Sequence, residues 1–127
     1  MKVFLPAAVL LGGLVAVPQA HALCTYPLAP GKFPDGTVAS RAEIDAAKAL
    51  VIQYDADMNA YLVCIRSEYE AKLALLADAT SEQKAELERV HEQKEDAANA
   101  EVKDVQDRIN AQVEAWNARN AAKKKSS

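Results

Sequence analysis

The feature that most constrains this chain is a long stretch without helix breakers. Residues 37–127 contain neither glycine nor proline, whereas the preceding residues 23–39 contain three prolines and two glycines. The long stretch is rich in Ala, Glu, Lys, Gln and Leu, which all favour helix. The sequence therefore predicts an all-α protein that begins with an extended, Pro-rich arm over residues 23–39.

Two capping boxes divide the stretch into two predicted helices, about 40–78 and about 81–122. Ser40 with Glu43 forms the first box, and Thr80 with Gln83 forms the second. Each helix carries an apolar stripe at steps of three and four residues. The first stripe consists of Ile44, Ala47, Val51, Tyr54, Met58, Leu62, Ile65, Tyr69, Leu73 and Leu76. The second consists of Leu87, Val90, Ala98, Val102, Val105, Ile109, Val113 and Trp116.

The two stripes match if the chain folds back on itself at residues 79 and 80. Val105 then lies opposite Tyr54, and Val90 lies opposite Tyr69. We therefore predict a long antiparallel helical hairpin that resembles a coiled coil. Because no glycine marks the turn, one unbroken helix of about 80 residues remains the alternative.

The first 22 residues have the pattern of a secretory signal peptide. Lys2 precedes an apolar run from Phe4 to Val17, and the segment ends in Ala20-His21-Ala22. The run is shorter than the roughly 20 residues of a membrane-spanning helix, so we expect cleavage after Ala22 and no integral membrane anchor. Lipidation at Cys24 is the alternative, although Leu23 is large for that kind of cleavage. The prediction places the protein in the periplasm or outside the cell.

Cys24 and Cys64 are the only cysteines, and we predict that they form a disulfide. Cys64 lies about 36 Å along the first helix from Ser40, and an extended arm can span that distance. Such a bridge would add roughly 4 kcal/mol in the chain-entropy model. A redox-active pair is the alternative, although the spacing is not C-x-x-C.

The arm is expected to cover one edge of the first helix. Its apolar side chains are Tyr26, Leu28 and Phe33, and the edge is formed by Leu50, Tyr61 and Ala46. Ile52 and Val63 share an azimuth on the opposite side of that helix. We regard Ile52, Val63 and Tyr61 as a candidate interaction surface, with self-association as one use of it.

No catalytic constellation and no cofactor motif is recognisable in the chain. His91 and Glu95 are one helical turn apart, but they lack the further ligands of a metal site, so we predict no metal. The tyrosines of the first stripe, together with Met58, could line a ligand groove, although such a stripe is usually core. The predicted mature chain has 14 basic and 18 acidic residues, which argues against nucleic-acid binding. The basic tail 123–127 is predicted to be disordered and too short for a lipid patch.

The segment from Cys24 to Cys64 contains C-x2-P-x2-P-x3-P-D-G and then Y-D-x-D-M-N-A-Y-L-V-C. It resembles small uncharacterised secreted proteins of Gram-negative bacteria over about the first half of the mature chain. The resemblance implies a periplasmic helical protein and no known active-site residues. We therefore expect a non-enzymatic protein that acts through contact with an unknown protein partner. A small-ligand or metal-binding periplasmic protein is the alternative.

Overall fold

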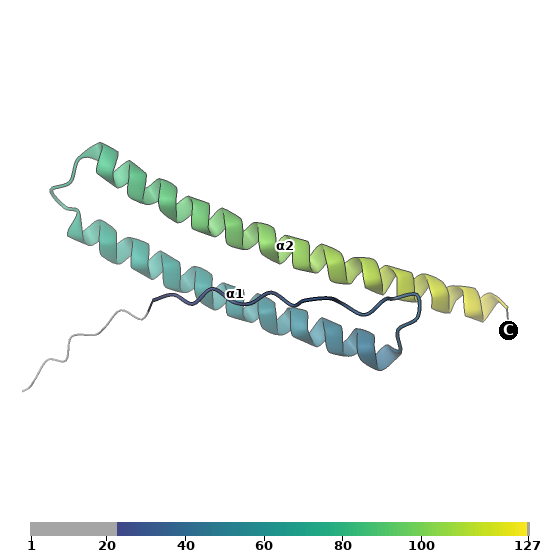
Figure 1. Ribbon diagram of the computed structural model, residues 1–127. Coiled ribbons are helices and arrows are strands. Elements are labelled where there is room, and N and C mark those ends of the chain that lie inside the picture. Colours follow the sequence, from purple (N-terminus) through teal and green to yellow (C-terminus); the bar gives the residue numbers. More distant parts are fainter. Residues whose placement is uncertain (1–22, 127) are drawn as a thin grey trace, which may run out of the picture.

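The computed structural model describes residues 23–126, and these form a long helical hairpin with an extended arm beside it (Figure 1). Helix α1 spans Arg41–Leu75 and helix α2 spans Ser81–Lys125. The hairpin prediction is confirmed, and the unbroken helix is wrong. The predicted signal peptide lies outside the described residues. Neither helix in this part of the chain is long and apolar enough to cross a membrane.

Both helices begin at the predicted capping boxes. Ser40 Oγ accepts a hydrogen bond from the Glu43 amide at 3.2 Å, and the Ser40 amide donates to the Glu43 carboxylate at 2.7 Å. Thr80 and Gln83 exchange the same two bonds at 3.2 and 3.0 Å. Each box satisfies two amides that the first helical turn would leave unpaired.

The ends of the helices differ from the prediction by three residues each. Helix α1 ends at Leu75 rather than 78, because the Leu76 amide bonds to the carbonyl of Leu73 and starts the turn. Helix α2 continues to Lys125, so most of the predicted disordered tail is helical. Lysines in the last turn favour this extension because they complement the negative end of the helix dipole.

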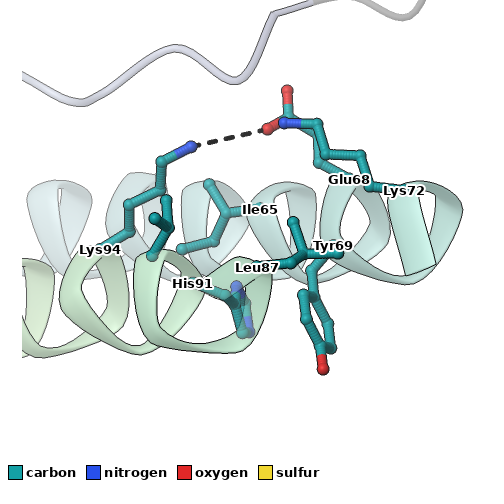
Figure 2. A pocket seen from close by; sticks show the side chains of 8 residues that line it. Ile65, Glu68, Tyr69, Lys72, Leu87, His91 and Lys94 are labelled. Carbon is teal, nitrogen blue, oxygen red and sulfur yellow. Dashed lines mark ion pairs between the residues drawn. The ribbon is translucent and has the colours of Figure 1, made fainter. Parts of the chain in front are cut away.

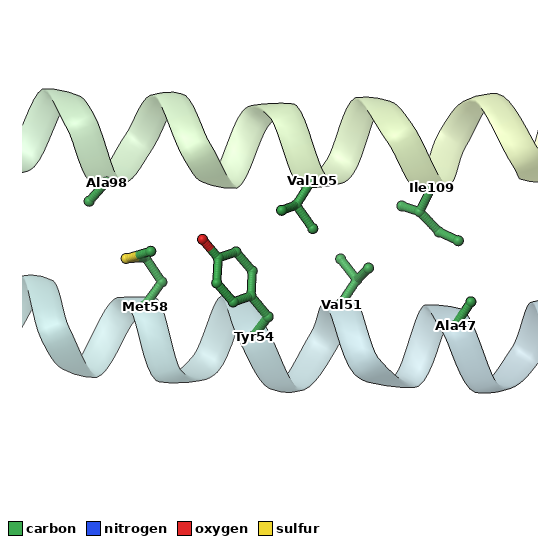
Figure 3. Packing of buried hydrophobic residues seen from close by; sticks show 7 residues of the cluster. All are labelled: Ala47, Val51, Tyr54, Met58, Ala98, Val105 and Ile109. Atoms are coloured by element: carbon green, nitrogen blue, oxygen red, sulfur yellow. The ribbon is translucent and has the colours of Figure 1, made fainter. Parts of the chain in front are cut away.

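The core lies in the seam between the helices and follows the predicted register (Figure 3). Its central cluster comprises Ala47, Val51, Tyr54, Met58, Ala98, Val105 and Ile109. Val105 is fully buried opposite Tyr54 and Val51, and the small Ala98 faces the larger Met58. Large side chains thus meet small ones, which allows two helices to pack closely.

The buried side chains are confined to one part of the hairpin. We call residues 24–65 and 98–125 the arm-covered half, and residues 66–97 the arm-free half. Every buried side chain of the described residues belongs to the arm-covered half, and none lies among residues 66–97. In the arm-free half Leu75 is 86% exposed and Val90 is 38% exposed. Among the described residues, the arm therefore lies beside the only part of the hairpin that has a closed core.

Candidate functional site

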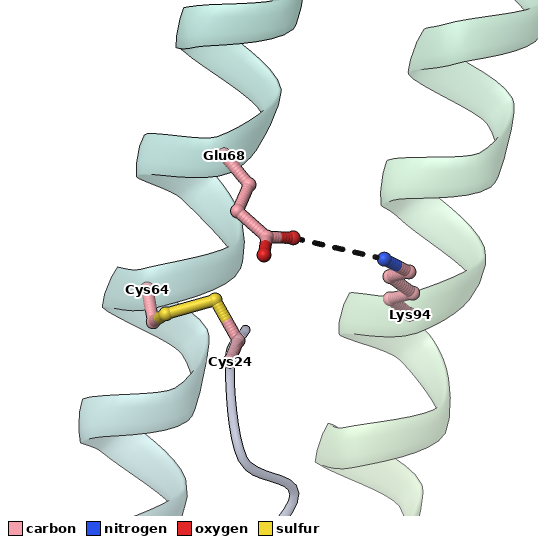
Figure 4. Close-up of a disulfide and its surroundings, with 4 residues drawn as sticks. All are labelled: Cys24, Cys64, Glu68 and Lys94. Carbon is pink, nitrogen blue, oxygen red and sulfur yellow. Dashed lines mark ion pairs between the residues drawn. A yellow bond between two sulfur atoms is a disulfide. The ribbon is translucent and has the colours of Figure 1, made fainter. Parts of the chain in front are cut away.

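The predicted disulfide is present and ties the arm to α1. Cys24 and Cys64 are bonded across a sequence separation of 40 residues, with their Cα atoms 5.7 Å apart. This separation is typical of disulfides in proteins. Figure 4 shows the bond on the flank of α1, with the Glu68–Lys94 ion pair between the helices nearby. Cys64 thus stands outside the seam, as its helical azimuth predicts.

The arm also binds α2, which the sequence analysis did not predict. The Tyr26 hydroxyl donates to a carboxylate oxygen of Glu101 at 2.5 Å. The guanidinium of Arg108 donates to the backbone carbonyls of Gly31 at 2.8 Å and Pro30 at 3.2 Å. The arm therefore bridges the two helices, in addition to its contacts with the edge of α1.

The turn between the arm and α1 is fastened to α2 as well. The Gly36 amide donates to the side-chain oxygen of Gln112 at 2.9 Å. A Cβ atom at Gly36 would lie 2.0 Å from the Gln112 carbonyl oxygen, so only glycine fits at this approach. Arg119 donates to the carbonyls of Thr37 at 3.0 Å and Ala39 at 2.6 Å. These bonds fix the entry of the chain into α1.

The residues of α2 that hold the arm share one face of the helix. Glu101, Arg108, Gln112 and Arg119 follow one another at steps of seven, four and seven residues. Such steps keep side chains within a narrow sector of a helix. This polar stripe was missed because charged residues on a helix are usually solvated. Its heptad-like spacing beside the apolar stripe is the signal that could have revealed it.

The apolar side chains of the arm behave as predicted only in part. Ala29 and Phe33 pack against the core cluster, and the Arg108 guanidinium lies 5.2 Å from the centre of the Phe33 ring. Leu28 was expected to cover α1, but it is 95% exposed. Extended backbone turns successive side chains in different directions, and here Leu28 faces away from the helices. That part of the prediction is wrong.

Tyrosine side chains of the arm and of α1 pack together near the disulfide. The rings of Tyr26 and Tyr61 meet edge to face with centroids 4.8 Å apart. Burial, together with the hydrogen bond to Glu101, raises the pKa of Tyr26 above its ordinary value. Burial also raises the pKa of Tyr54, with the nearby Glu101 carboxylate adding to the effect. These phenols stay neutral at physiological pH and serve as packing and hydrogen-bonding groups.

The candidate interaction surface divides into two places in the structure. Ile52 is 71% exposed and Val63 is 67% exposed on α1, away from the arm. Val63 borders an open hollow of about 460 Å³ that is also lined by Asn59, Leu62, Arg66, Ser67 and Glu70. Tyr61, by contrast, is half-buried against Tyr26. Ile52 and Val63, which lie eleven residues apart on α1, are therefore the outward apolar surface, and Tyr61 does not share it.

A small cavity lies between the helices in the arm-free half (Figure 2). It is lined by Ile65, Glu68, Tyr69, Lys72, Leu87, Val90, His91 and Lys94. Its volume of about 20 Å³ accommodates roughly one water molecule. The His91 ring stacks on Tyr69 at 4.5 Å, and His91 Nε2 lies 3.2 Å from the Glu95 carboxylate. This cavity has no room for a substrate or cofactor.

The predicted candidates for chemistry are not assembled into a reactive site. His91 pairs with Glu95, and the same carboxylate oxygen accepts a bond from Arg66 at 3.2 Å. Among residues 23–126, no group of three or more His, Cys, Asp or Glu side chains is placed to hold a metal ion. His91 and Glu95 thus contribute to the contact between the two helices.

The chain was compared with known proteins at three levels. It matches no protein-family model, no curated protein and no solved structure. The resemblance to secreted proteins of Gram-negative bacteria therefore stays a prediction. The function has to be argued from the residues of this chain alone.

Proposed function

We propose that this chain is a non-enzymatic periplasmic or secreted protein that acts through contact with another protein. An adaptor, a chaperone-like factor or a structural component of the envelope would fit this description. The leader sequence supports export, and the Cys24–Cys64 bond is compatible with an oxidising compartment. The proposal needs a surface that can receive a partner.

The outward apolar surface of α1 carries the proposal. Ile52 and Val63 are largely exposed, although the hairpin core does not need them. The hollow beside Val63 offers a concave contact, and Arg66 and Glu70 supply polar groups at its border. An apolar centre with a polar rim is the usual arrangement of a protein–protein interface.

A small-ligand or metal-binding protein is the weaker candidate. The side chains that would line such a groove include Tyr54 and Met58, which are 3% and 1% exposed in the seam between the helices. The cavity farther along the hairpin holds about 20 Å³. The aromatic stripe therefore serves as core, which favours the contact function over ligand binding.

Site-specific photo-crosslinking tests the proposal. A photoreactive phenylalanine derivative would replace Val63 in one variant and Leu28 in another, and both would be irradiated in the exporting cells. Leu28 is the control because it is also apolar and exposed but lies on the arm. We expect one discrete adduct from position 63 and none from position 28, with an adduct of twice the monomer mass identifying self-association.

A different crosslinking result would contradict the proposal. If position 63 gives no adduct, or the same adducts as position 28, the surface has no dedicated partner. A thermal-shift screen with divalent metals and small molecules then decides for the alternative, because a saturating ligand must raise the melting temperature.

A further inference from the structure

The open end of the hairpin gathers basic residues that are far apart in the sequence. At this end helix α2 continues past the start of α1, close to the point where the arm turns into α1 (Figure 1). To the three terminal lysines of the predicted tail, the fold adds Arg41 from α1 and Arg119 from α2. Five cationic groups therefore share this end, within the range of basic clusters that attract phosphate-bearing surfaces.

Arg41, Lys123 and Lys124 border an open hollow at this end of the hairpin. Its volume is about 610 Å³. It is lined by Arg41, Trp116, Asn117, Asn120, Ala121, Lys123 and Lys124. The lining contains basic, amide and aromatic side chains but neither Asp nor Glu. The positive charge of the lining comes from Arg41, Lys123 and Lys124, and Arg41 also pairs with Asp45 outside the lining.

Two of the lining side chains carry buried donors that have no partner. Trp116 Nε1 and Asn120 Nδ2 are enclosed, and neither makes a hydrogen bond within the described residues. Arg119 Nε, one turn from Trp116, is in the same condition. Unpaired buried donors are costly, and an acceptor that reached them from the hollow would remove that cost.

Arg41 adds a charged donor with spare capacity. Asp45 accepts from its Nε at 3.0 Å, which leaves the two terminal amino groups of the guanidinium for another acceptor. The guanidinium carbon lies 5.8 Å from the centre of the Trp116 ring. Arg41 is therefore held beside the hollow by both an ion pair and a cation–π contact.

We propose that this hollow binds a phosphate group, carried either by a small phosphorylated molecule or by a lipid headgroup. A phosphate offers three or more acceptor oxygens, which suits several converging donors better than a carboxylate does. The hollow is larger than one phosphate, so the rest of the ligand lies against Trp116. Tryptophan suits both sources, since its ring is apolar and its N–H is polar.

The single tryptophan of the chain makes the test direct. Its fluorescence would be followed while the full mature protein is titrated with inorganic phosphate, with glycerol phosphate, and with vesicles of phosphatidylcholine plus phosphatidylglycerol. Chloride and pure phosphatidylcholine vesicles are the references, and ionic strength is held constant because salt screens exposed charges. We expect a saturable change in fluorescence with at least one phosphate source and none with the references.

A double variant locates the site. Arg41→Gln with Lys124→Gln should weaken binding roughly tenfold or more, as the loss of two charge-assisted contacts requires. Arg89→Gln with Lys72→Gln removes the same charges from the arm-free half and should leave the affinity unchanged. Asn120→Asp provides a third, nearly isosteric variant, because it exchanges a donor for an acceptor and should also abolish binding.

Each outcome decides the proposal. A response to the free phosphates identifies a small phosphorylated ligand, and a response to the anionic vesicles alone identifies a lipid headgroup. If none of the three sources gives a saturable change, the proposal is overturned. Equal weakening by both double variants would also overturn it, since the attraction would then be a property of overall charge. Melting curves of all variants confirm that each one is folded.

Discussion

The two halves of the hairpin are built from the same two helices, yet they are held together differently. The arm-covered half has a closed apolar core and an arm that bonds to both helices. In the arm-free half no side chain is buried, and ion pairs also link the helices, such as Arg66 with Glu95 at 3.2 Å and Lys94 with Glu68 at 4.0 Å. Exposed ion pairs contribute little to stability, typically below about 1 kcal/mol each.

The comparison shows what the arm does for the fold. Two helices share one seam, and each side of the seam is open to water unless something covers it. Ala29 and Phe33 of the arm pack on the core cluster, and the disulfide holds the far end of the arm in place. We infer that the arm acts as the third wall of a core that two helices cannot close alone.

The largest difference between the halves should come from placing a charge in the seam. Val105→Asp buries a carboxylate at a fully buried position and should lower the free energy of unfolding by about 4 kcal/mol or more. Val90→Asp makes the same change in the arm-free half, where the side chain is 38% exposed, and should cost about 1 kcal/mol or less. Chemical denaturation followed by circular dichroism measures both. Equal losses would contradict the contrast between the halves.

Removing the disulfide should come next in size. Cys24→Ser combined with Cys64→Ser frees the arm and should lower the free energy of unfolding by about 4 kcal/mol or somewhat less. The loss is expected to be smaller than the chain-entropy model gives, because the arm keeps its hydrogen bonds to Arg108, Gln112 and Arg119. Denaturant titrations of the double variant and of the oxidised protein give the difference. An unchanged midpoint would show that the disulfide contributes nothing to stability.

A methyl group at Gly36 should disturb only the arm-covered half. Gly36→Ala would bring a Cβ atom 2.0 Å from a backbone oxygen of Gln112, so the turn must move away from α2. We expect a loss of about 2 to 3 kcal/mol. Gly31→Ala is the matched control, because nothing lies within 4 Å of a Cβ atom there. No left-handed glycine occurs in the described residues, so the contrast reports on space alone. Similar melting temperatures for the two variants would refute the close approach.

The smallest effect is a pH dependence at the alkaline end. The pKa of Tyr26 is raised by burial and by its bond to Glu101, relative to an ordinary value of 10.0. A raised pKa in the folded state contributes stability below pH 10, and this contribution is lost as the pH rises through the folded value. Tyr26→Phe should therefore flatten the decline of the melting temperature above pH 10. An unchanged decline in the variant would place the phenol outside the Glu101 contact.

Much of this architecture could be predicted because the signals are local or periodic. The capping boxes at Ser40 and Thr80 act within one helical turn, and the apolar stripes repeat with the helical period. The Cys24–Cys64 pairing followed from their being the only cysteines of a chain predicted to be exported, and the length of the arm and the rise of the helix allow it. Such inferences need only the spacing of residues along the chain.

The contacts of the arm with α2 could not be predicted in the same way. Arg108 and Arg119 bind backbone carbonyls, which every residue has, so no complementary partner is visible in the sequence. The close approach at Gly36 could not be predicted either, because it depends on where α2 passes. The exposed position of Leu28 likewise depends on how the arm rotates between its anchors. Each of these features depends on which segments lie close together in the folded chain, and residue spacing alone does not show that.

Hydrogen exchange measured by mass spectrometry tests the role of the arm most directly. Peptides from residues 41–65 and 98–120 would be compared with peptides from 66–97, in the oxidised protein and in the protein lacking both cysteines. The account predicts that the arm-covered half exchanges much more slowly in the oxidised protein, and that this protection falls when the tether is removed, while the arm-free half changes little. Uniform protection along both helices, unaffected by loss of the tether, would contradict it.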